Sequence, residues 1–328
     1  MLHSIKTETL DVLDSLKSTQ INKNNIFVFA VGYEQRSIAI FKKYIKGIDI
    51  PKICFLFDDY DNFEIAKDNK RIAEDKSVEL IKVGYKNNDK VIDVIVEKIE
   101  ELKKNTDKFN LHIDYSSMPR SWYCNIPIKI NTILRPYDKV FFWYCEGHYE
   151  KKAEVWPSAG IEDVYVFYGK SSLRPINNRS HIIGLGFDSI RTQAIQSVLD
   201  PGFLVVTCSY PPYNEKLRDV ILSKNKSLIN TSAFAIELPV DDFEFSISKL
   251  YETVKELYDN GDVILVPDGP KPQILATSLI PYMINKTGII CLHIKRHEGF
   301  YQPLNVKAKK GVFGFSYSID NASTKESC

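Results

Sequence analysis

Short apolar runs alternate with amphipathic stretches along most of the chain. Runs rich in β-branched and aromatic side chains predict buried strands, and apolar stripes spaced three and four residues apart predict helices. This alternation is typical of βαβ units around a mostly parallel sheet. In the first part of the chain the predicted strands are 26–31, 52–57, 78–83, 110–114 and 140–145, and the predicted helices are 5–18, 37–45, 63–74, 91–103 and 122–134.

The same order of elements begins again near residue 173. Each half also closes on a further β-rich run, 164–168 or 312–318, which we interpret as a returning edge strand. The sequence thus predicts an α/β fold of two Rossmann-like parallel-sheet halves related by internal duplication: residues 1–172 with an N-terminal helix, and residues 173–328 with a polar C-terminal tail. In the second half the predicted strands are 181–185, 203–208, 233–238, 263–266 and 289–294, and the predicted helices are 245–258 and 274–284.

The two halves can be matched at a constant offset of 154 residues. The interval from the strand-end glycine to the strand-end aspartate is then 82 residues in both. The alternative is coincidence within one undivided α/β domain, since unrelated segments share about one residue in sixteen by chance. The matched pairs are Gly32 with Gly186, Tyr33 with Phe187, Glu34 with Asp188, Cys54 with Cys208, Asp114 with Asp268, Pro127 with Pro281, and Asn131 with Asn285.

A glycine, an aromatic residue and an acid follow the first predicted strand of each half, with an arginine and a hydroxyl nearby. Glycine lets the backbone approach a ligand closely, and the N–H groups that begin the next helix attract anions. Arginine adds bidentate recognition of phosphate. The alternative is a simple helix cap by Ser37 or Asp188. The ligand-binding candidates here are Gly32, Arg36, Ser37, Gly186, Asp188, Arg191 and Thr192.

A second polar group follows the fourth predicted strand of each half. Ligands of open α/β sheets bind outside the carboxyl ends of the strands, so we expect these groups to face a ligand. The alternative is a rigid strand-to-helix turn in which the aspartate acts as a cap. The candidates are Asp114, Ser116, Ser117 and Arg120 in the first half, and Asp268 and Lys271 in the second.

The run from Asp114 through Ser116 to Arg120 resembles the loop motif of CARF domains, which are CRISPR-associated Rossmann-fold ligand-binding modules. Ser117 and Met118 stand where that motif has glycines. A fused pair of such units also resembles SAVED domains. The resemblance implies recognition of a linear or cyclic oligonucleotide across the paired units, often in antiviral signalling, and an effector or partner protein. The ligand contacts that it implies are Ser116, Ser117, Arg120 and Lys271.

Composition narrows the choice of ligand and location. A formal net charge of +1 indicates no extended basic surface for long nucleic acid, yet a few cations can still bind an anionic nucleotide-type ligand. The six cysteines form no CxxC pair, so we expect buried reduced thiols, and no metal or cofactor. The chain has no apolar stretch of about 18 residues and no signal-peptide centre at its start, so we expect no membrane span and a cytoplasmic location.

Weaker candidates each have a plainer structural alternative. The run Asp58, Asp59, Tyr60 and Asp61 follows a strand where an acid often meets a ribose, and residues 146–150 include Glu146 and His148, which suit a metal or proton transfer. A solvated loop is the alternative for both. His112, inside an apolar strand, is interpreted as a core residue, and Cys208 has no assignable histidine partner for a role as nucleophile.

Three classes of function follow from these patterns. A binding module would line a pocket shared by the two halves with Arg36, Arg120, Arg191 and Lys271. An enzyme acting on a nucleoside, nucleotide or phosphoester would use an acid as its catalytic group. A scaffold subunit would need the clusters only as caps, with Trp143, Tyr144 and Trp156 as exposed partner contacts. The catalytic candidates are Glu34, Asp114 and Asp188.

Overall fold

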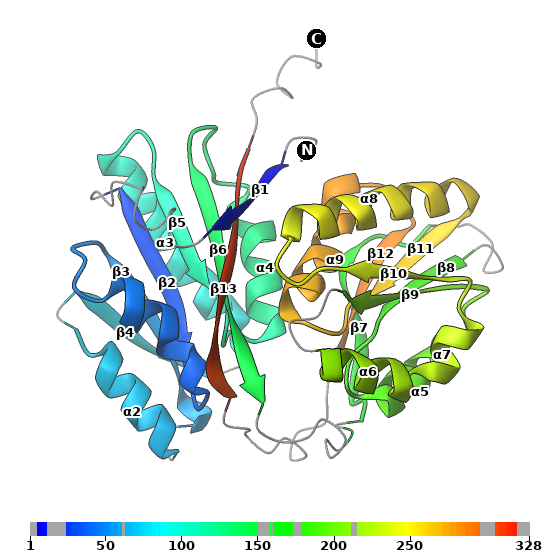
Figure 1. The fold of residues 1–328 in the computed structure, drawn as a ribbon. Helices are drawn as coiled ribbons and strands as arrows, with labels where there is room; N and C mark the ends of the chain where they lie inside the picture. Colours follow the sequence, from blue (N-terminus) through cyan, green and yellow to red (C-terminus); the bar gives the residue numbers. More distant parts are fainter. Residues whose placement is uncertain are drawn as a thin grey trace, which may run out of the picture. The chain divides into compact units, whose positions relative to one another are not determined.

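The computed structural model divides the chain into two compact units (Figure 1). The first unit comprises Ser4–Glu150 and Pro303–Cys328, and the second comprises Met1–His3 and Lys151–Gln302. The residues that the structure describes are 5–11, 24–60, 63–75, 77–84, 86–149, 158, 160–172, 179–210, 215–295 and 306–319.

The first unit contains a seven-stranded sheet in the order β1-β13-β6-β5-β2-β3-β4. Five neighbouring strands are parallel, and β13 and then β1 continue the sheet in antiparallel register. The strands are β1 (Ile5–Asp11), β2 (Asn25–Val31), β3 (Lys52–Phe57), β4 (Val78–Val83), β5 (Asn110–Asp114), β6 (Lys139–Tyr149) and β13 (Val306–Ile319).

The second unit contains a six-stranded sheet in the order β10-β9-β8-β11-β12-β7. Here too five neighbouring strands are parallel, and the edge strand β7 is antiparallel to β12. The strands are β7 (Asp163–Gly169), β8 (Arg179–Gly184), β9 (Phe203–Ser209), β10 (Phe234–Leu238), β11 (Asp262–Val266) and β12 (Ile289–Lys295). The fold is therefore α/β, with two Rossmann-like halves whose parallel strands have the same order.

The two sheets exchange the antiparallel strands that follow their parallel strands along the chain. Strand β7 follows β6 along the chain but pairs with β12, whereas β13 follows β12 along the chain but pairs with β6. Both predicted returning strands exist, but each completes the sheet of the other half. A boundary between residues 172 and 173 thus does not separate the two sheets.

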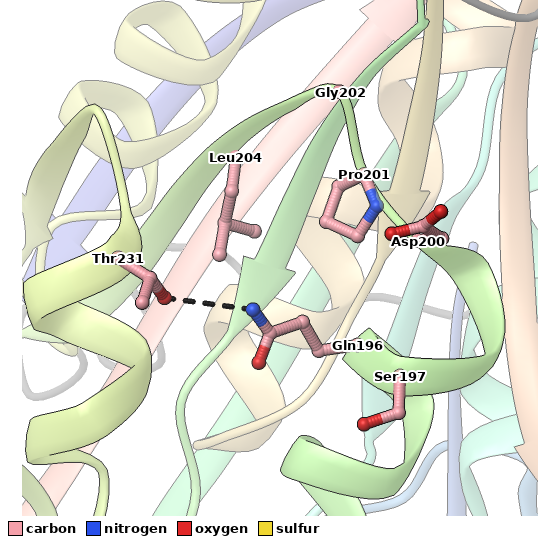
Figure 2. A pocket seen from close by; sticks show the side chains of 7 residues that line it. All are labelled: Gln196, Ser197, Asp200, Pro201, Gly202, Leu204 and Thr231. Atoms are coloured by element: carbon pink, nitrogen blue, oxygen red, sulfur yellow. Dashed lines mark hydrogen bonds between the residues drawn. The ribbon is translucent and has the colours of Figure 1, made fainter.

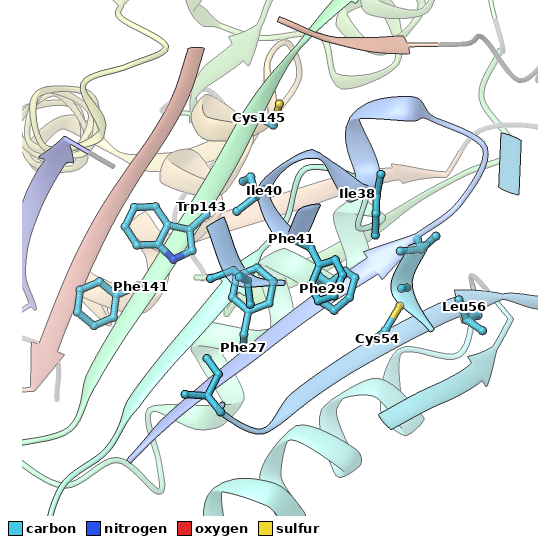
Figure 3. Close-up of a cluster of buried hydrophobic side chains, with 14 residues drawn as sticks. Phe27, Phe29, Ile38, Ile40, Phe41, Cys54, Leu56, Phe141, Trp143 and Cys145 are labelled. Carbon is cyan, nitrogen blue, oxygen red and sulfur yellow. The ribbon is translucent and has the colours of Figure 1, made fainter. Parts of the chain in front are cut away.

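Helices cover both faces of the first sheet. One face packs against two short irregular helices and α2, and its buried side chains include Phe27, Phe29 and Trp143 (Figure 3). On the other face, Trp122 of α4 packs against Phe55 of β3 at a ring-centroid distance of 5.8 Å. The helical elements of this unit are η1 (Gln35–Ile38), η2 (Phe41–Ile45), η3 (Asp58–Tyr60), α2 (Glu64–Ala73), α3 (Asn88–Asn105) and α4 (Arg120–Ile130).

The second unit has an equivalent core. Ile195, Ile221 and Leu228 bring three helices against one face of the sheet, where they meet buried strand residues such as Val206. The helices are α5 (Ser189–Leu199), α6 (Glu215–Lys224), α7 (Lys226–Thr231), α8 (Phe243–Asn260) and α9 (Lys271–Ile284). Among the described residues, no helix is both long and apolar enough to cross a membrane.

Two predictions about local structure are wrong. Residues 5–11 form strand β1 instead of the first part of a helix, because the β-branched residues Ile5, Thr7 and Thr9 favour a strand and the segment pairs with β13 in antiparallel register. Residues 12–18 of that predicted helix lie outside the described part. Trp143 and Tyr144 were expected to be exposed, but both are buried because β6 is an inner strand between β5 and β13. Trp156 lies outside the described residues.

The constant offset of 154 residues holds for the first strands and for the ends of α4 and α9, where the C-caps Asn131 and Asn285 donate to Pro127 O and Pro281 O, but it does not hold for the other parallel strands. Phe29 pairs with Asp114 in the first sheet, and Ile183 pairs with Val266 in the second. The equivalent of Asp114 is therefore Val266, and Asp268 lies two residues beyond it. Cys54 and Cys208 are displaced in the same way, since Phe29 pairs with Cys54 and Ile183 with Val206. The connections between strands differ in length, so one offset cannot align every element.

Candidate functional site

In both units the predicted polar groups lie at the carboxyl ends of parallel strands. In the first unit the loop after β2 is fixed by Asn69 of α2, a buried residue that sequence reasoning missed. Its Nδ2 donates to Gly32 O at 2.9 Å, to Glu34 O at 3.0 Å and to Ser37 Oγ at 3.1 Å. Ser37, predicted either to bind a ligand or to cap a helix, is buried within η1 and engaged with this amide.

Arg36 is buried in the same loop and is paired with an acid. Its Nε donates to Glu34 Oε2 at 2.8 Å, and its Nη1 donates to Tyr144 OH at 3.2 Å. A Cβ at Gly147 of β6 would lie 2.9 Å from Arg36 Nη1 and 2.3 Å from Val306 Cγ1. Only glycine leaves room there for the guanidinium beside the exchanged strand β13. Arg36 thus has a strong structural role.

Asp114 and Ser116 connect the end of β5 to β6. Asp114 Oδ1 accepts hydrogen bonds from Ser116 N at 2.9 Å and from Ser116 Oγ at 2.5 Å. Ser116 Oγ in turn accepts from Cys145 N at 2.8 Å. Both side chains are buried, so this chain of bonds fixes the start of the loop to the neighbouring strand.

Two residues of that loop lie closer to solvent. Ser117 is half-buried and donates from Oγ to Glu34 Oε2 at 3.4 Å, which joins the loops after β2 and β5 into one cluster. Arg120 is half-buried and is the first residue of α4, after Pro119 as the N-cap. The first cluster, as we define it, comprises Gly32, Glu34, Arg36, Ser37, Asp114, Ser116, Ser117 and Arg120.

The second unit repeats this arrangement with other residues. Asn225 is buried, and its Nδ2 donates to Gly186 O at 3.0 Å, as Asn69 does to Gly32. Asp188 is the N-cap of α5 and accepts from Arg191 N at 3.1 Å, so the capping alternative is correct for this residue. Thr192 is buried and donates from Oγ1 to Asp188 O at 2.9 Å.

Arg191 joins the two loops of the second unit. It is buried, forms a salt bridge with Asp268 and lies 3.4 Å from Asp188 through Nη1 and Oδ2. Its Nε has no hydrogen-bond partner among the described residues. The loop after β11 crosses β8 so closely that a Cβ at Gly184 would lie 2.3 Å from Asp268 O. The second cluster comprises Gly186, Asp188, Arg191, Thr192, Asp268 and Lys271.

Lys271 corresponds to Arg120 in the structure, although the constant offset assigns Ile274 to that position. Both cations are the first residue of the helix that follows the fourth parallel strand, and both follow a proline N-cap, Pro119 or Pro270. Neither proline can cap its helix with a side-chain hydrogen bond. Each helix start therefore combines a positive side chain with the positive end of the helix dipole.

The three catalytic candidates are all engaged in contacts with other residues of the clusters. Glu34 pairs with Arg36, Asp188 pairs with Arg191, and Asp114 accepts from Ser116. No group of three or more His, Cys, Asp or Glu side chains that could hold a metal occurs among the described residues. These contacts suit a positioning role for the acids, and the chemistry that the clusters offer is binding of anions and hydroxyl groups.

His112 is a core residue, as expected from its strand. It accepts a hydrogen bond at Nδ1 from Trp143 Nε1 at 3.2 Å, and its Nε2 lies 2.9 Å from Asn25 Oδ1, which requires a neutral ring with its proton on Nε2. Burial lowers the pKa of His112 to about 3, which keeps the ring neutral.

The described cysteines Cys54, Cys124, Cys145, Cys208 and Cys291 are free and buried, as predicted. Burial raises the pKa of Cys208 and raises that of Cys145 to about 12, so neither is a ready nucleophile. Glu146 and His148 lie in strand β6, so the predicted surface loop is wrong at these positions. Asp58 and Asp59 are exposed in η3, and Asp61 lies outside the described residues.

A hollow of about 390 Å³ lies at the amino end of β9 in the second unit, away from the second cluster (Figure 2). It is lined mostly by the end of α5 and the turn into β9, and Gln196 Nε2 reaches Thr231 Oγ1 of α7 at 3.5 Å. Ligands of open parallel sheets bind at the opposite, carboxyl edge, so this hollow does not coincide with the predicted site. The lining residues are Gln196, Ser197, Asp200, Pro201, Gly202, Leu204 and Thr231.

Comparison with known proteins assigns no family. No protein-family model matches the chain, and no curated protein matches it. A solved structure described as the crystal structure of an N-terminal ketoreductase from macrolactin assembly line is similar with a TM-score of 0.22 and 8% identity, over 87% of this chain and 72% of that chain. A likeness of that size identifies neither a family nor a function.

Proposed function

We propose that each unit binds a nucleotide-type ligand at the carboxyl ends of its parallel strands, with phosphate at the start of α4 in the first unit and at the start of α9 in the second. One observation carries the proposal: two units with different residues present the same polar set at equivalent strand ends. Each set combines a strand-end glycine, a buried arginine with a hydroxyl residue after it, and a helix that begins with a cation. The repetition is unexpected for a set that serves only as caps.

The cations divide into two groups. Arg36 and Arg191 are buried and neutralised by acids, so they shape the loops. Arg120 and Lys271 stand at solvent-accessible helix starts, where phosphate gains both from the cation and from the backbone N–H groups. A linear or cyclic oligonucleotide is the finer proposal for the ligand, since it would present several phosphates. A sensor role with a partner effector would follow from that ligand.

Binding and turnover of a nucleotide panel test this proposal. Mononucleotides and linear and cyclic oligonucleotides are titrated by calorimetry, and the mixtures are analysed for products. We expect binding without turnover. Arg120→Ala and Lys271→Ala should each weaken nucleotide binding roughly 10- to 150-fold, which is the range for the loss of one hydrogen bond to a charged group. Lys129→Ala is the matched control, because Lys129 is an exposed cation at the opposite end of α4.

The other outcomes separate the rival functions. Turnover that Asp114→Asn abolishes while binding persists would replace the binding module with an enzyme. An absence of binding to every member of the panel would leave the clusters as structural caps and favour a scaffold.

A further inference from the structure

An exposed aromatic residue stands where helix α2 needs a cap. Phe63 is the N-cap of α2 and is 40% exposed, and it makes no capping hydrogen bond. Ser, Thr, Asp or Asn at an N-cap stabilises a helix, and an exposed phenylalanine gains little from burial. Helix stability therefore does not account for this residue.

The position of Phe63 relative to the first cluster is fixed by Asn69. That residue ties α2 to the loop after β2 through Gly32 and Glu34. Phe63 consequently lies beside Tyr33, with ring centroids 6.1 Å apart and the planes tilted by 50°. Tyr33 directly precedes Glu34 of the first cluster and is half-buried. Two aromatic rings thus form a partly exposed surface next to the proposed binding site.

The second unit has an exposed aromatic residue in the corresponding connection, after its second parallel strand. Tyr210 directly follows β9, the counterpart of β3, and is 43% exposed. The guanidinium of Arg218 lies 4.6 Å from its ring centroid. An exposed aromatic residue in the connection after the second parallel strand is thus a feature of both units.

We infer that Phe63 and Tyr33 form a stacking platform for a nucleobase of the ligand. This inference rests on the proposed function. It assigns a contact to the base of the nucleotide, whereas the proposed function assigns contacts to the phosphate groups. Every nucleobase has a flat π-face, and stacking on an aromatic side chain contributes to binding with little dependence on sequence. Glu34 and Ser117, hydrogen-bonded beside the platform, are then placed to meet sugar hydroxyls.

The test separates the base from the rest of the nucleotide. AMP, GMP, CMP and UMP are titrated against the full chain alongside ribose 5-phosphate, which has no base. Phe63→Ser removes the ring and supplies a good N-cap, so loss of binding cannot be attributed to a weakened helix. We expect Phe63→Ser to weaken nucleotide binding roughly 5- to 150-fold, to leave ribose 5-phosphate affinity unchanged, and Phe63→Trp to restore binding.

The control variant is Tyr137→Ala. Tyr137 is 73% exposed but precedes β6, at the amino edge of the sheet, so its loss should change neither affinity. Two results would overturn the platform but not the proposed function. One is that Phe63→Ser binds nucleotides as tightly as the unsubstituted chain does. The other is that Phe63→Ser weakens binding of ribose 5-phosphate as much as binding of nucleotides. An unsubstituted chain that binds neither these probes nor any linear or cyclic oligonucleotide of the panel overturns the proposed function and the platform with it.

Discussion

Two buried asparagines hold the strand-end loops of the two units. Asn69 and Asn225 each donate to the carbonyl of the glycine that follows the first parallel strand. A buried carbonyl without its donor is costly, so these amides contribute more than a surface hydrogen bond would. They fix the backbone from which the arginine and acid of each cluster extend.

Replacement of either asparagine by leucine should therefore destabilise the protein. We expect Asn69→Leu and Asn225→Leu each to lower the free energy of unfolding by about 1–3 kcal/mol, because a leucine of similar size leaves the carbonyls without a donor. Urea unfolding measures this. Asn105→Leu is the control, since the side chain of exposed Asn105 donates to Glu101 O within its own helix and holds no strand-end loop. An equal loss of unfolding free energy in all three variants would show that the two buried asparagines do not hold these loops.

His112 predicts a dependence of stability on pH. Its pKa is about 3 in the folded chain because of burial, below the ordinary value near 6.5. The unfolded chain therefore binds a proton that the folded chain does not, and stability falls as pH decreases from about 6.5 towards 3. His181, whose pKa burial lowers to about 4, acts in the same direction.

The variant His112→Gln should reduce that dependence. One proton of difference corresponds to about 1.4 kcal/mol per pH unit, so between about pH 4.5 and 5.5 the unfolding free energy of the variant should fall less steeply by this amount. Unfolding in urea at several pH values gives the slopes. Identical slopes for the variant and the unsubstituted chain would show that His112 is not kept neutral by the fold.

At the scale of elements, some parts of the fold could be predicted from sequence and others could not. The inner parallel strands are continuous apolar runs, because helices cover both faces of each sheet. The sequence therefore predicts these strands correctly. Helix α5 was missed because Ile190 and Val198 on its outer side are exposed, which hides the amphipathic pattern. The asparagine pair was missed because Asn69 and Asn225 are 156 residues apart, outside the constant offset.

The loop after β11 crosses β8 so closely that a side chain at Gly184 should destabilise the second unit. Gly184→Ala would place a Cβ 2.3 Å from Asp268 O, so the loop must move. We expect a loss of at least about 1–3 kcal/mol in the free energy of unfolding, the usual cost of overpacking. Gly84→Ala is matched to it, because a Cβ at Gly84 meets no atom within 4 Å. A Gly184→Ala variant as stable as Gly84→Ala would contradict the close crossing.

In the molecule as a whole, the exchange of strands β7 and β13 couples distant parts of the sequence. An antiparallel strand that follows the parallel strands along the chain fits either sheet, so the sequence could not show which sheet β7 and β13 join. The exchange makes each sheet depend on a strand from the other half of the chain, as in domain swapping within one molecule. It also places both Val306 and Arg36 next to Gly147, an arrangement that no local pattern indicates.

Removal of β13 should therefore weaken the first unit and not the second. A chain that ends at residue 302 leaves β6 as an open edge. In hydrogen exchange with mass spectrometry we expect amides of β6 to lose protection, while amides of β8, β9 and β11 keep theirs. A chain that ends at residue 320 retains β13 and is the control. If amides of β8, β9 and β11 lost protection before those of β6, that result would contradict the pairing of β13 with the first sheet.

A hydrogen-exchange footprint of a bound nucleotide shows directly whether the ligand lies at the carboxyl ends of the strands. The chain is compared with and without a saturating member of the panel. We expect slower exchange in the loops 32–37 and 114–120 of the first unit and 186–192 and 267–271 of the second, at the carboxyl ends of the strands. Protection confined to the amino edge, around Gln196 and Gly202, or no protection in any of the four loops, would contradict this placement of the ligand.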